Sequence, residues 1–350
     1  MNYDEQVIKI IQGIFLEIPF IDLTECNQNY DFGNGFVADI SINFVYKNEA
    51  REIILEVKPR GEPRFVRDAV NQLLRYKEFR PNAYYMIAAP YISQYSADIC
   101  KNADIGYLDL AGNIYINNEP LFIQKKVDRN PLAEKRELIK LYSPKAERIL
   151  RVMLDTGKKK WITEELSKEA NVSIGLVAKV KNILINKEWV ESEYGGFSLI
   201  KPFDLLKEWS ENYQYQKNRR LYFYSMSSVK EMEFKLGQYF IGNNIPYAFT
   251  GQSAGARYAP MVRYKTIKVY INTVNIKNDL EHKLEIKQVD SGANIHFLIP
   301  YDEGLLYGLK QFDGLFVVSQ IQAYLDLIND KARGEEAAIE IINNGILKKW

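Results

Sequence analysis

Three charged residues in two neighbouring strand-like segments could form a metal-dependent hydrolytic site. Asp39 lies in the run FVADISI, and Glu56 and Lys58 lie in the following run IILEVK. Side chains alternate along a strand, so Glu56 and Lys58 point to the same side, and a hairpin would bring Asp39 to face them. Two carboxylates could then bind Mg²⁺ through oxygen, while Lys58 orients a water and stabilises charge on a phosphate. The pattern predicts Mg²⁺-dependent cleavage of a phosphodiester.

These residues resemble the PD-(D/E)xK nuclease superfamily, with Asp39 as its aspartate and Glu56 and Lys58 as its E-x-K. Gln72 and Tyr76 are four residues apart on the next predicted helix and therefore share a face. They match the Q-x-x-x-Y pattern of the RecB-like branch. The resemblance implies a restriction-endonuclease-like domain over residues 1–128, with all five residues in catalysis and the two carboxylates as metal ligands.

A structural interpretation of the same residues stays open. The Glu-x-Lys tripeptide occurs again at 233–235, 281–283 and 285–287, so it identifies nothing alone. Asp39 could cap a turn, and Glu56 with Lys58 could be a solvated cross-strand pair. Ala38 also stands where the superfamily's name has Pro, a common departure. The fold often persists as a binding module, so both cleavage and binding remain possible outcomes.

The order of elements around these residues predicts a mixed sheet with helices packed on it. Apolar residues at helical spacing predict the first helix, and alternating runs predict the strands. The expected elements are a helix at residues 7–15, strands at 35–46 and 52–58, a helix at 63–79, and strands at 83–89, 106–110 and 113–116.

The middle segment, residues 140–201, predicts a winged helix-turn-helix. Its expected elements are a helix from Pro144, a short helix at 164–170, a third helix up to Lys187, and a hairpin at 189–200. Thr163 and Ser173 have side chains suited to capping the second and third helices. Helix, helix, tight turn, helix and hairpin is the order of the winged helix-turn-helix family, and the segment resembles it throughout. The resemblance implies double-stranded DNA as the partner.

The third helix of this segment is predicted to contact bases and phosphates in the major groove. Its outward residues are Ser173, Gly175, Lys179 and Lys181, and the preceding turn adds Lys158, Lys159 and Lys160 as phosphate contacts. The segment from Pro144 to Lys201 carries 11 Lys and Arg against 8 Asp and Glu, so it is only mildly basic. A winged helix that contacts a protein instead of DNA is the open alternative.

Residues 218–350 predict an α+β domain, with a helix near 231–243, strands at 269–271 and 295–298, and a helical stretch from Gln320. Three segments are distinctive: TGQSAGARY (250–258), VSQIQAYLDL (318–327) and RGEEAA (333–338). Together they resemble the AbiEi-type family of transcriptional-regulator antitoxins from type IV toxin–antitoxin systems. The resemblance implies a DNA-binding repressor that offsets a nucleotidyltransferase-like toxin encoded nearby, without a stable complex. Simpler members begin with the winged helix, whereas here a further domain precedes it.

The C-terminal domain is not expected to be an enzyme. Gly251 and Ser253 are similar to the Gly-Ser start of nucleotidyltransferases, but the strand that follows, 267–271, reads IKVYI and lacks the carboxylate pair that binds Mg²⁺. Arg257, Arg263 and Arg333 could instead bind phosphates or pair with the acidic residues after Gly334.

Composition limits the remaining classes of function. The 350 residues suit two or three domains, with a net charge of +1. Two cysteines and two histidines are too few for a disulfide framework, a zinc site or histidine-based catalysis, and they favour a reducing cytoplasm. No apolar run is long enough to span a bilayer, so no membrane partner is expected. The sequence predicts a multidomain α/β and α+β regulator that binds DNA, with a Mg²⁺-dependent nuclease targeted by the winged helix as the alternative.

Overall fold

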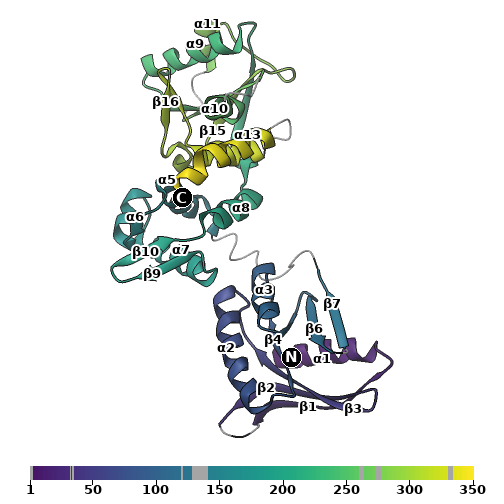
Figure 1. Cartoon of the computed structure of the whole chain (residues 1–350). Coiled ribbons are helices and arrows are strands. Elements are labelled where there is room, and N and C mark those ends of the chain that lie inside the picture. Colours follow the sequence, from purple (N-terminus) through teal and green to yellow (C-terminus); the bar gives the residue numbers. More distant parts are fainter. Residues whose placement is uncertain are drawn as a thin grey trace. The chain divides into compact units, whose positions relative to one another are not determined.

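The computed structural model describes residues 3–31, 33, 35–119, 121–127, 141–259, 264–272, 277–329 and 334–350. Contacts divide the chain into two compact units, residues 1–137 with 184–188, and residues 138–183 with 189–350 (Figure 1). The middle and C-terminal regions therefore share one unit, and the helix α8 (Pro202–Asn212) connects them. The division into three domains stays a prediction. The mixed α/β architecture expected for the whole chain is confirmed.

The first unit is built on a seven-stranded sheet whose strands follow one another in chain order (Figure 1, purple to blue). Its strands are β1 (Ile21–Asp31), β2 (Val37–Tyr46), β3 (Glu49–Val57), β4 (Tyr84–Ala89), β5 (Gly106–Asp109), β6 (Ile114–Asn118) and β7 (Leu121–Lys125). The pairs β3–β4 and β4–β5 are parallel, and the other neighbours are antiparallel. Parallel pairs need long connections, which the helices α2 (Pro63–Phe79) and α3 (Gln94–Asn102) provide.

Helices cover both faces of this sheet. Helix α1 (Tyr3–Leu16) buries Val7, Ile11 and Phe15 against one face. Helices α2 and α3 pack on the other face, where Leu73 is fully buried. Helix α2 has Pro63 at its first position and a buried stripe at helical spacing, which is why the sequence sets its bounds so clearly.

The expected helices and strands of this unit are confirmed, but three elements were missed. Strand β1 reads IDLTECNQNYD and is mostly exposed, so it lacks the alternation that identifies a strand. It forms because β2 offers it a full antiparallel partner, with Ile21 opposite Tyr46 and Asp31 opposite Val37. Helix α3 and strand β7 are short, and their patterns are correspondingly weak.

The first part of the second unit combines four helices and a three-stranded sheet. Its elements are α5 (Pro144–Thr156), β8 (Lys160–Trp161), α6 (Thr163–Glu169), α7 (Ile174–Asn186), β9 (Val190–Glu193), β10 (Gly196–Leu199) and α8, with strand order β8-β10-β9. The expected helices and hairpin lie where they were predicted. Ser173 caps α7, since its Oγ accepts the N–H of Leu176 at 3.3 Å. The capping prediction for Thr163 is wrong: Ile162 is the extended N-cap residue, and Thr163 is already the first residue of the helix.

The rest of the second unit is a seven-stranded sheet with helices on both faces. Its strands are β11 (Arg219–Tyr224), β12 (Tyr247–Thr250), β13 (Ile267–Ile271), β14 (Lys287–Gln288), β15 (Ile295–Ile299), β16 (Lys310–Phe312) and β17 (Leu315–Val317), in the order β14-β11-β15-β13-β12-β17-β16. Its helices are α9 (Val229–Gly242), α10 (Gly251–Tyr258), α11 (Lys277–Leu284), α12 (Gln320–Ile328) and α13 (Gly334–Ile341), with single turns at Tyr215–Lys217, Glu303–Leu306 and 342–349. The predicted helices and strands here are confirmed.

Opposite faces of this second sheet hold different helices. Phe240 of α9 packs its ring against Phe297 of β15, which places α9 on one face. Tyr270 of β13 donates to Asp326 of α12, which places α12 on the other. No helix in the described part of the chain is long and apolar enough to cross a membrane.

Candidate functional site

Strand pairing brings the two predicted metal ligands to the same face of the first sheet. Ile40 of β2 is opposite Leu55 of β3, so Asp39 and Glu56 are the next pair along the same ladder. One oxygen of Asp39 accepts the backbone N–H of Val57 at 2.7 Å. Glu56 is 2% exposed. Burial and the charge of the nearby Asp39 carboxylate both raise the pKa of Glu56, so the two carboxyl groups lie close enough to interact.

Lys58, Gln72 and Tyr76 complete a continuous hydrogen-bonded cluster on this face. The ammonium of Lys58 donates to Glu56 Oε2 at 2.7 Å and to Gln72 Oε1 at 3.0 Å. The Gln72 side-chain amide donates to the Tyr76 hydroxyl, which in turn donates to the carbonyl of Val37 at 3.2 Å. Helix α2 therefore brings Gln72 and Tyr76 onto residues from both strands at the open end of the β2–β3 hairpin. The structure therefore brings the five predicted residues together in one cluster.

The cluster has a buried carboxyl with incomplete hydrogen bonding. Burial raises the pKa of Glu56, the ammonium of Lys58 opposes that shift, and the charge of Asp39 adds to it. Oε1 of Glu56 is buried and has no hydrogen-bond partner. Burial and the nearby Asp39 charge also raise the pKa of Asp4 on α1. Asp4 was not predicted, because nothing in its surrounding sequence indicates that α1 begins near this cluster.

The donor set of the cluster fits a magnesium ion. Mg²⁺ in proteins is held by one or two carboxylates and keeps several waters, and the acceptor atom Glu56 Oε1 is available for such a bond. Among the described residues no group of three or more His, Cys, Asp or Glu could hold a metal. A metal here would therefore rest on Asp39 and Glu56 together with water.

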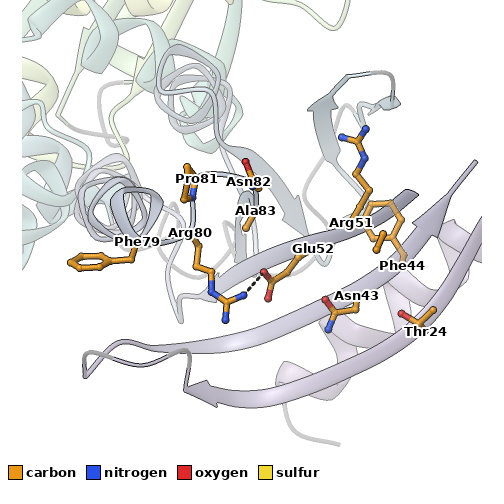
Figure 2. A pocket seen from close by; sticks show the side chains of 11 residues that line it. Thr24, Asn43, Phe44, Arg51, Glu52, Phe79, Arg80, Pro81, Asn82 and Ala83 are labelled. Carbon is orange, nitrogen blue, oxygen red and sulfur yellow. Dashed lines mark hydrogen bonds and ion pairs between the residues drawn. The ribbon is translucent and has the colours of Figure 1, made fainter. Parts of the chain in front are cut away.

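A separate cavity of about 520 Å³ lies on the same unit (Figure 2). It is lined by Thr24, Asn43, Phe44, Ala50, Arg51, Glu52, Phe79, Arg80, Pro81, Asn82 and Ala83. Asn43 is opposite Glu52, four residues along the ladder from Asp39 and Glu56, which is about 13 Å. Arg80 and Glu52 form an ion pair across it, with nitrogen and oxygen 3.2 Å apart. The cavity is distinct from the carboxylate cluster, and no sequence pattern predicted it.

The residues of α7 that were predicted to contact DNA differ in their solvent exposure. Ser173, Gly175 and Lys179 are exposed, and a Cβ added to Gly175 would meet nothing within 4 Å. Lys181 is half-buried, with its ammonium 4.8 Å from the centre of the Phe197 ring on β10. Lys181 was expected to point outward, but its side chain lies against the hairpin.

The three lysines before α6 lie at the turn between α5 and β8. Lys158 is exposed. Lys159 pairs with Glu165 at 2.7 Å, and Lys160 pairs with Glu193 at 3.1 Å. Exposed pairs of this kind contribute at most about 1 kcal/mol, so a phosphate can compete for these ammonium groups.

A buried polar network joins α5 to the C-terminal sheet within the second unit. Arg151 of α5 is fully buried and donates to Gln322 of α12 at 2.9 Å. Gln322 donates to Asp326 at 2.8 Å, and Thr250 and Tyr270 donate to the same carboxyl. Sequence reasoning missed this network, since its members are far apart along the chain.

The carboxyl of Asp326 is the centre of that network. Burial raises its pKa to about 6, and the hydrogen bonds from its four neighbours oppose the shift. Burial also raises the pKa of Glu147 on α5, and the positive charge of Arg151 opposes this shift.

Of the three arginines considered for phosphate binding, the structure describes one. Arg257 pairs with Glu233 of α9 at 2.8 Å rather than with residues after Gly334. Arg263 and Arg333 lie outside the described residues.

Comparison with known proteins identifies the C-terminal region. Residues 198–347 match the sequence model of a family of transcriptional regulators. That family is described as "Transcriptional regulator, AbiEi antitoxin, Type IV TA system", and this region of the chain is similar to it. The three distinctive segments all lie inside the match, so the predicted resemblance is confirmed there. The match supports an antitoxin-type transcriptional regulator for this region.

Other comparisons add little to this assignment. No curated protein matches the chain. Two solved structures are similar at 16% identity, "Structure of EndoMS-dsDNA2 complex" and "Structure of EndoMS in apo form". They cover 30% and 29% of this chain, with TM-scores of 0.21 and 0.20. The chain spans less than half the length of either structure, 44% and 45%.

Proposed function

We propose that this chain is an antitoxin-type transcriptional repressor that binds its operator duplex through a winged helix-turn-helix at residues 140–201. The observation that carries this proposal is the exposed surface of α7, which follows a tight turn and leads into the β9–β10 hairpin. The antitoxin family match in the adjoining region supports the same function.

The dimensions and chemistry of α7 suit the major groove. Its 13 residues span about 20 Å, and the groove is wide enough to admit one helix. Gly175 and Lys179 lie on an exposed side of the helix. The bulky apolar residue on that side is Ile174, which is 54% exposed. Lys158 lies at the neighbouring turn, where a DNA backbone would pass. Phosphate contacts from Lys158 and Lys179 would give affinity, and the exposed Ser173 and Gly175 would lie beside the bases.

The test is duplex binding by the double variant Lys158→Ala/Lys179→Ala, with Lys230→Ala on α9 as the matched control. Each lost phosphate contact should reduce the slope of log K against log salt by about 0.9. Fluorescence anisotropy with the chain's own promoter region, at several salt concentrations, measures this slope. Unchanged affinity and slope in the double variant would place the duplex site elsewhere.

The toxin partner is proposed to be a nucleotidyltransferase-like enzyme encoded nearby, offset without a stable complex. We propose that the regulator acts in the cytoplasm, where the free thiols of Cys26 and Cys100 fit a reducing compartment. Co-expression of the neighbouring gene with and without this chain tests the assignment. Growth arrest that this chain relieves is expected; arrest that persists would contradict the antitoxin role.

The carboxylate cluster of the first unit favours a second candidate, a Mg²⁺-dependent nuclease of the PD-(D/E)xK type that the winged helix targets to DNA. The specific observation is the convergence of Asp39, Glu56 and Lys58, supported by Gln72 and Tyr76. Bound Mg²⁺ would supply Lewis-acid activation of a phosphate and a water. Asp39 and Glu56 would hold the ion.

In that reaction the chain's own residues have separate tasks. Lys58 donates hydrogen bonds, so it can orient a water and stabilise negative charge that develops on a phosphate oxygen. Gln72 fixes the Lys58 ammonium from the helix side, and Tyr76 fixes Gln72, so both are positioning residues.

DNA incubation with and without Mg²⁺ tests this candidate, comparing the native chain with Lys58→Ala and with Lys77→Ala. Lys77 lies on the same helix as Gln72 but pairs with Asp104 instead of the cluster. Cleavage that needs Mg²⁺ and Lys58 but not Lys77 would support a nuclease. Thermal stabilisation by Mg²⁺ that disappears in Glu56→Gln, without any cleavage, would reduce the site to a metal-binding one.

A further inference from the structure

The sheet of the second unit carries positive charge and no carboxylate on its strands. Within the seven strands as described there is no Asp or Glu, whereas the basic residues are Arg219, Arg220, Lys268, His296, Lys287 and Lys310. The whole chain is nearly neutral, so this excess of basic over acidic residues is a property of the sheet and not of the chain as a whole. Such a surface attracts anionic ligands.

One row of side chains crosses three strands of this sheet. Tyr222 of β11 is directly opposite His296 of β15, which is opposite Lys268 of β13. The Tyr222 and His296 rings meet edge to face, with centroids 4.9 Å apart. The row lies on the face that holds α12, because Lys268 and Tyr270 are two residues apart on one strand.

The outer end of this face exposes aromatic rings next to a cation. Tyr222 and Tyr224 share the face and are 36% and 43% exposed. Tyr224 is directly opposite Lys287, the first residue of β14, which is exposed. Met226, just beyond the strand, is 93% exposed. We call the surface formed by Tyr222, Tyr224, Lys287 and His296 the aromatic face.

The helix that covers the inner strands stops short of this aromatic face. Tyr270 is fully buried under α12, and Lys268 is nearly buried beside Tyr215. The nearby carboxylate of Glu281 accepts the backbone N–H of Gln288 at 3.3 Å, so its charge is engaged at the edge of β14. Two tyrosine rings and a lysine therefore remain open on a positively charged sheet.

Exposed aromatic rings on a basic sheet suit unpaired bases. Rings stack on bases of any identity, and cations beside them bind the phosphates that connect those bases. Tyrosines two residues apart on one strand are about 7 Å apart, which allows two successive bases to stack. Paired bases have no free faces along the duplex, so this chemistry selects single strands.

We propose that the aromatic face binds single-stranded RNA, with two bases stacked on Tyr222 and Tyr224 and a phosphate bound by Lys287. The tyrosine hydroxyls lie at the edges of the stacking rings, where they can hydrogen-bond to ribose 2′-hydroxyls; this is why RNA is chosen over DNA. The surface lies on a different element from α7, so the proposal goes beyond duplex binding by the repressor.

The test measures binding of a fluorescein-labelled ten-nucleotide oligo(U) to the full chain. At the low end of the usual stacking contribution, Tyr222→Ala/Tyr224→Ala should weaken binding by about 30-fold. Tyr222→Phe/Tyr224→Phe keeps both rings and should retain stacking, and Phe234→Ala on α9 is the control for loss of an exposed ring. Lys287→Ala should lower the salt dependence of binding.

Oligo(dT) of equal length and a duplex of the proposed operator complete the design. We expect RNA to bind more tightly than oligo(dT), and the double Ala variant to keep its operator affinity. Absence of oligo(U) binding, or equal binding by the native chain and the double Ala variant, would overturn the proposal. Equal affinity for oligo(U) and oligo(dT) would overturn the choice of RNA. Loss of operator binding only in the Lys158→Ala/Lys179→Ala variant would show that the two surfaces act separately.

Discussion

Replacing Asp326 by Asn tests how the second unit tolerates its buried carboxyl group. The Asp326 carboxyl is 1% exposed and accepts hydrogen bonds from Thr250, Tyr213, Tyr270 and Gln322. Asn has nearly the same shape and cannot ionise. The variant therefore removes the titration while preserving most of the packing.

The expected magnitude follows from the pKa of Asp326. Burial raises it from 3.8 to about 6 in the folded protein. A carboxyl with a folded pKa above its unfolded pKa binds its proton more tightly when folded, so the free energy of unfolding falls as pH rises between those two values. Each pH unit in that window removes about 1.4 kcal/mol. The native chain should therefore lose about 2.4 kcal/mol between pH 4 and pH 7 through this one group.

Urea unfolding followed by tryptophan fluorescence measures this loss. The chain's four tryptophans, Trp161, Trp189, Trp209 and Trp350, all belong to the second unit, so their emission reports that unit alone. The difference in unfolding free energy between the native chain and Asp326→Asn should shift by about 2.4 kcal/mol in favour of Asn from pH 4 to pH 7. Glu147 titrates in both proteins, so the difference isolates Asp326.

Asp313→Asn in the exposed β16–β17 turn is the control, because it removes a carboxyl from the same unit without touching the network. Its difference from the native chain should not depend on pH in this way. A difference between the native chain and Asp326→Asn that stays constant from pH 4 to pH 7 would refute the reasoning. It would mean that the four donors hold the folded pKa near its unfolded value.

Three further substitutions have definite expectations. Gly61→Ala should lower the stability of the first unit by roughly 1–3 kcal/mol in a circular dichroism melt, because its Cβ would lie 1.9 Å from the carbonyl oxygen of Tyr91; an unchanged Tm would contradict this. Glu56→Gln should stabilise the first unit at pH 7 without Mg²⁺ and flatten the decline of its Tm with rising pH, because burial raises the pKa of Glu56; a steeper decline would be the wrong sign. Ser173→Ala should cost about 1 kcal/mol in urea unfolding through the lost cap, whereas Thr163→Ala should cost less, and equal losses would argue against the observed caps.

The sequence determined the elements whose patterns repeat along a short stretch. Helix α2 was expected at 63–79 and spans Pro63–Phe79, because its proline and apolar spacing both act within a few turns. The predicted cap at Ser173 was also local, since a side chain and an N–H three residues away decide it. The E-x-K and Q-x-x-x-Y patterns could be recognised for the same reason, since each spans only a few residues. The segments at 250–258 and 318–327 indicated the family whose model matches this region.

Tertiary structure decided what depends on partners distant in sequence. Strand β1 is too polar to be predicted and exists because β2 pairs with it. The position of Lys181 depends on Phe197, which the chain brings back through the hairpin. Thr250 and Asp326 are 76 residues apart in sequence, yet they share a buried hydrogen bond. Burying such polar groups is favourable only when all of their hydrogen-bonding partners are in place. No short stretch of sequence specifies partners that come from distant parts of the chain.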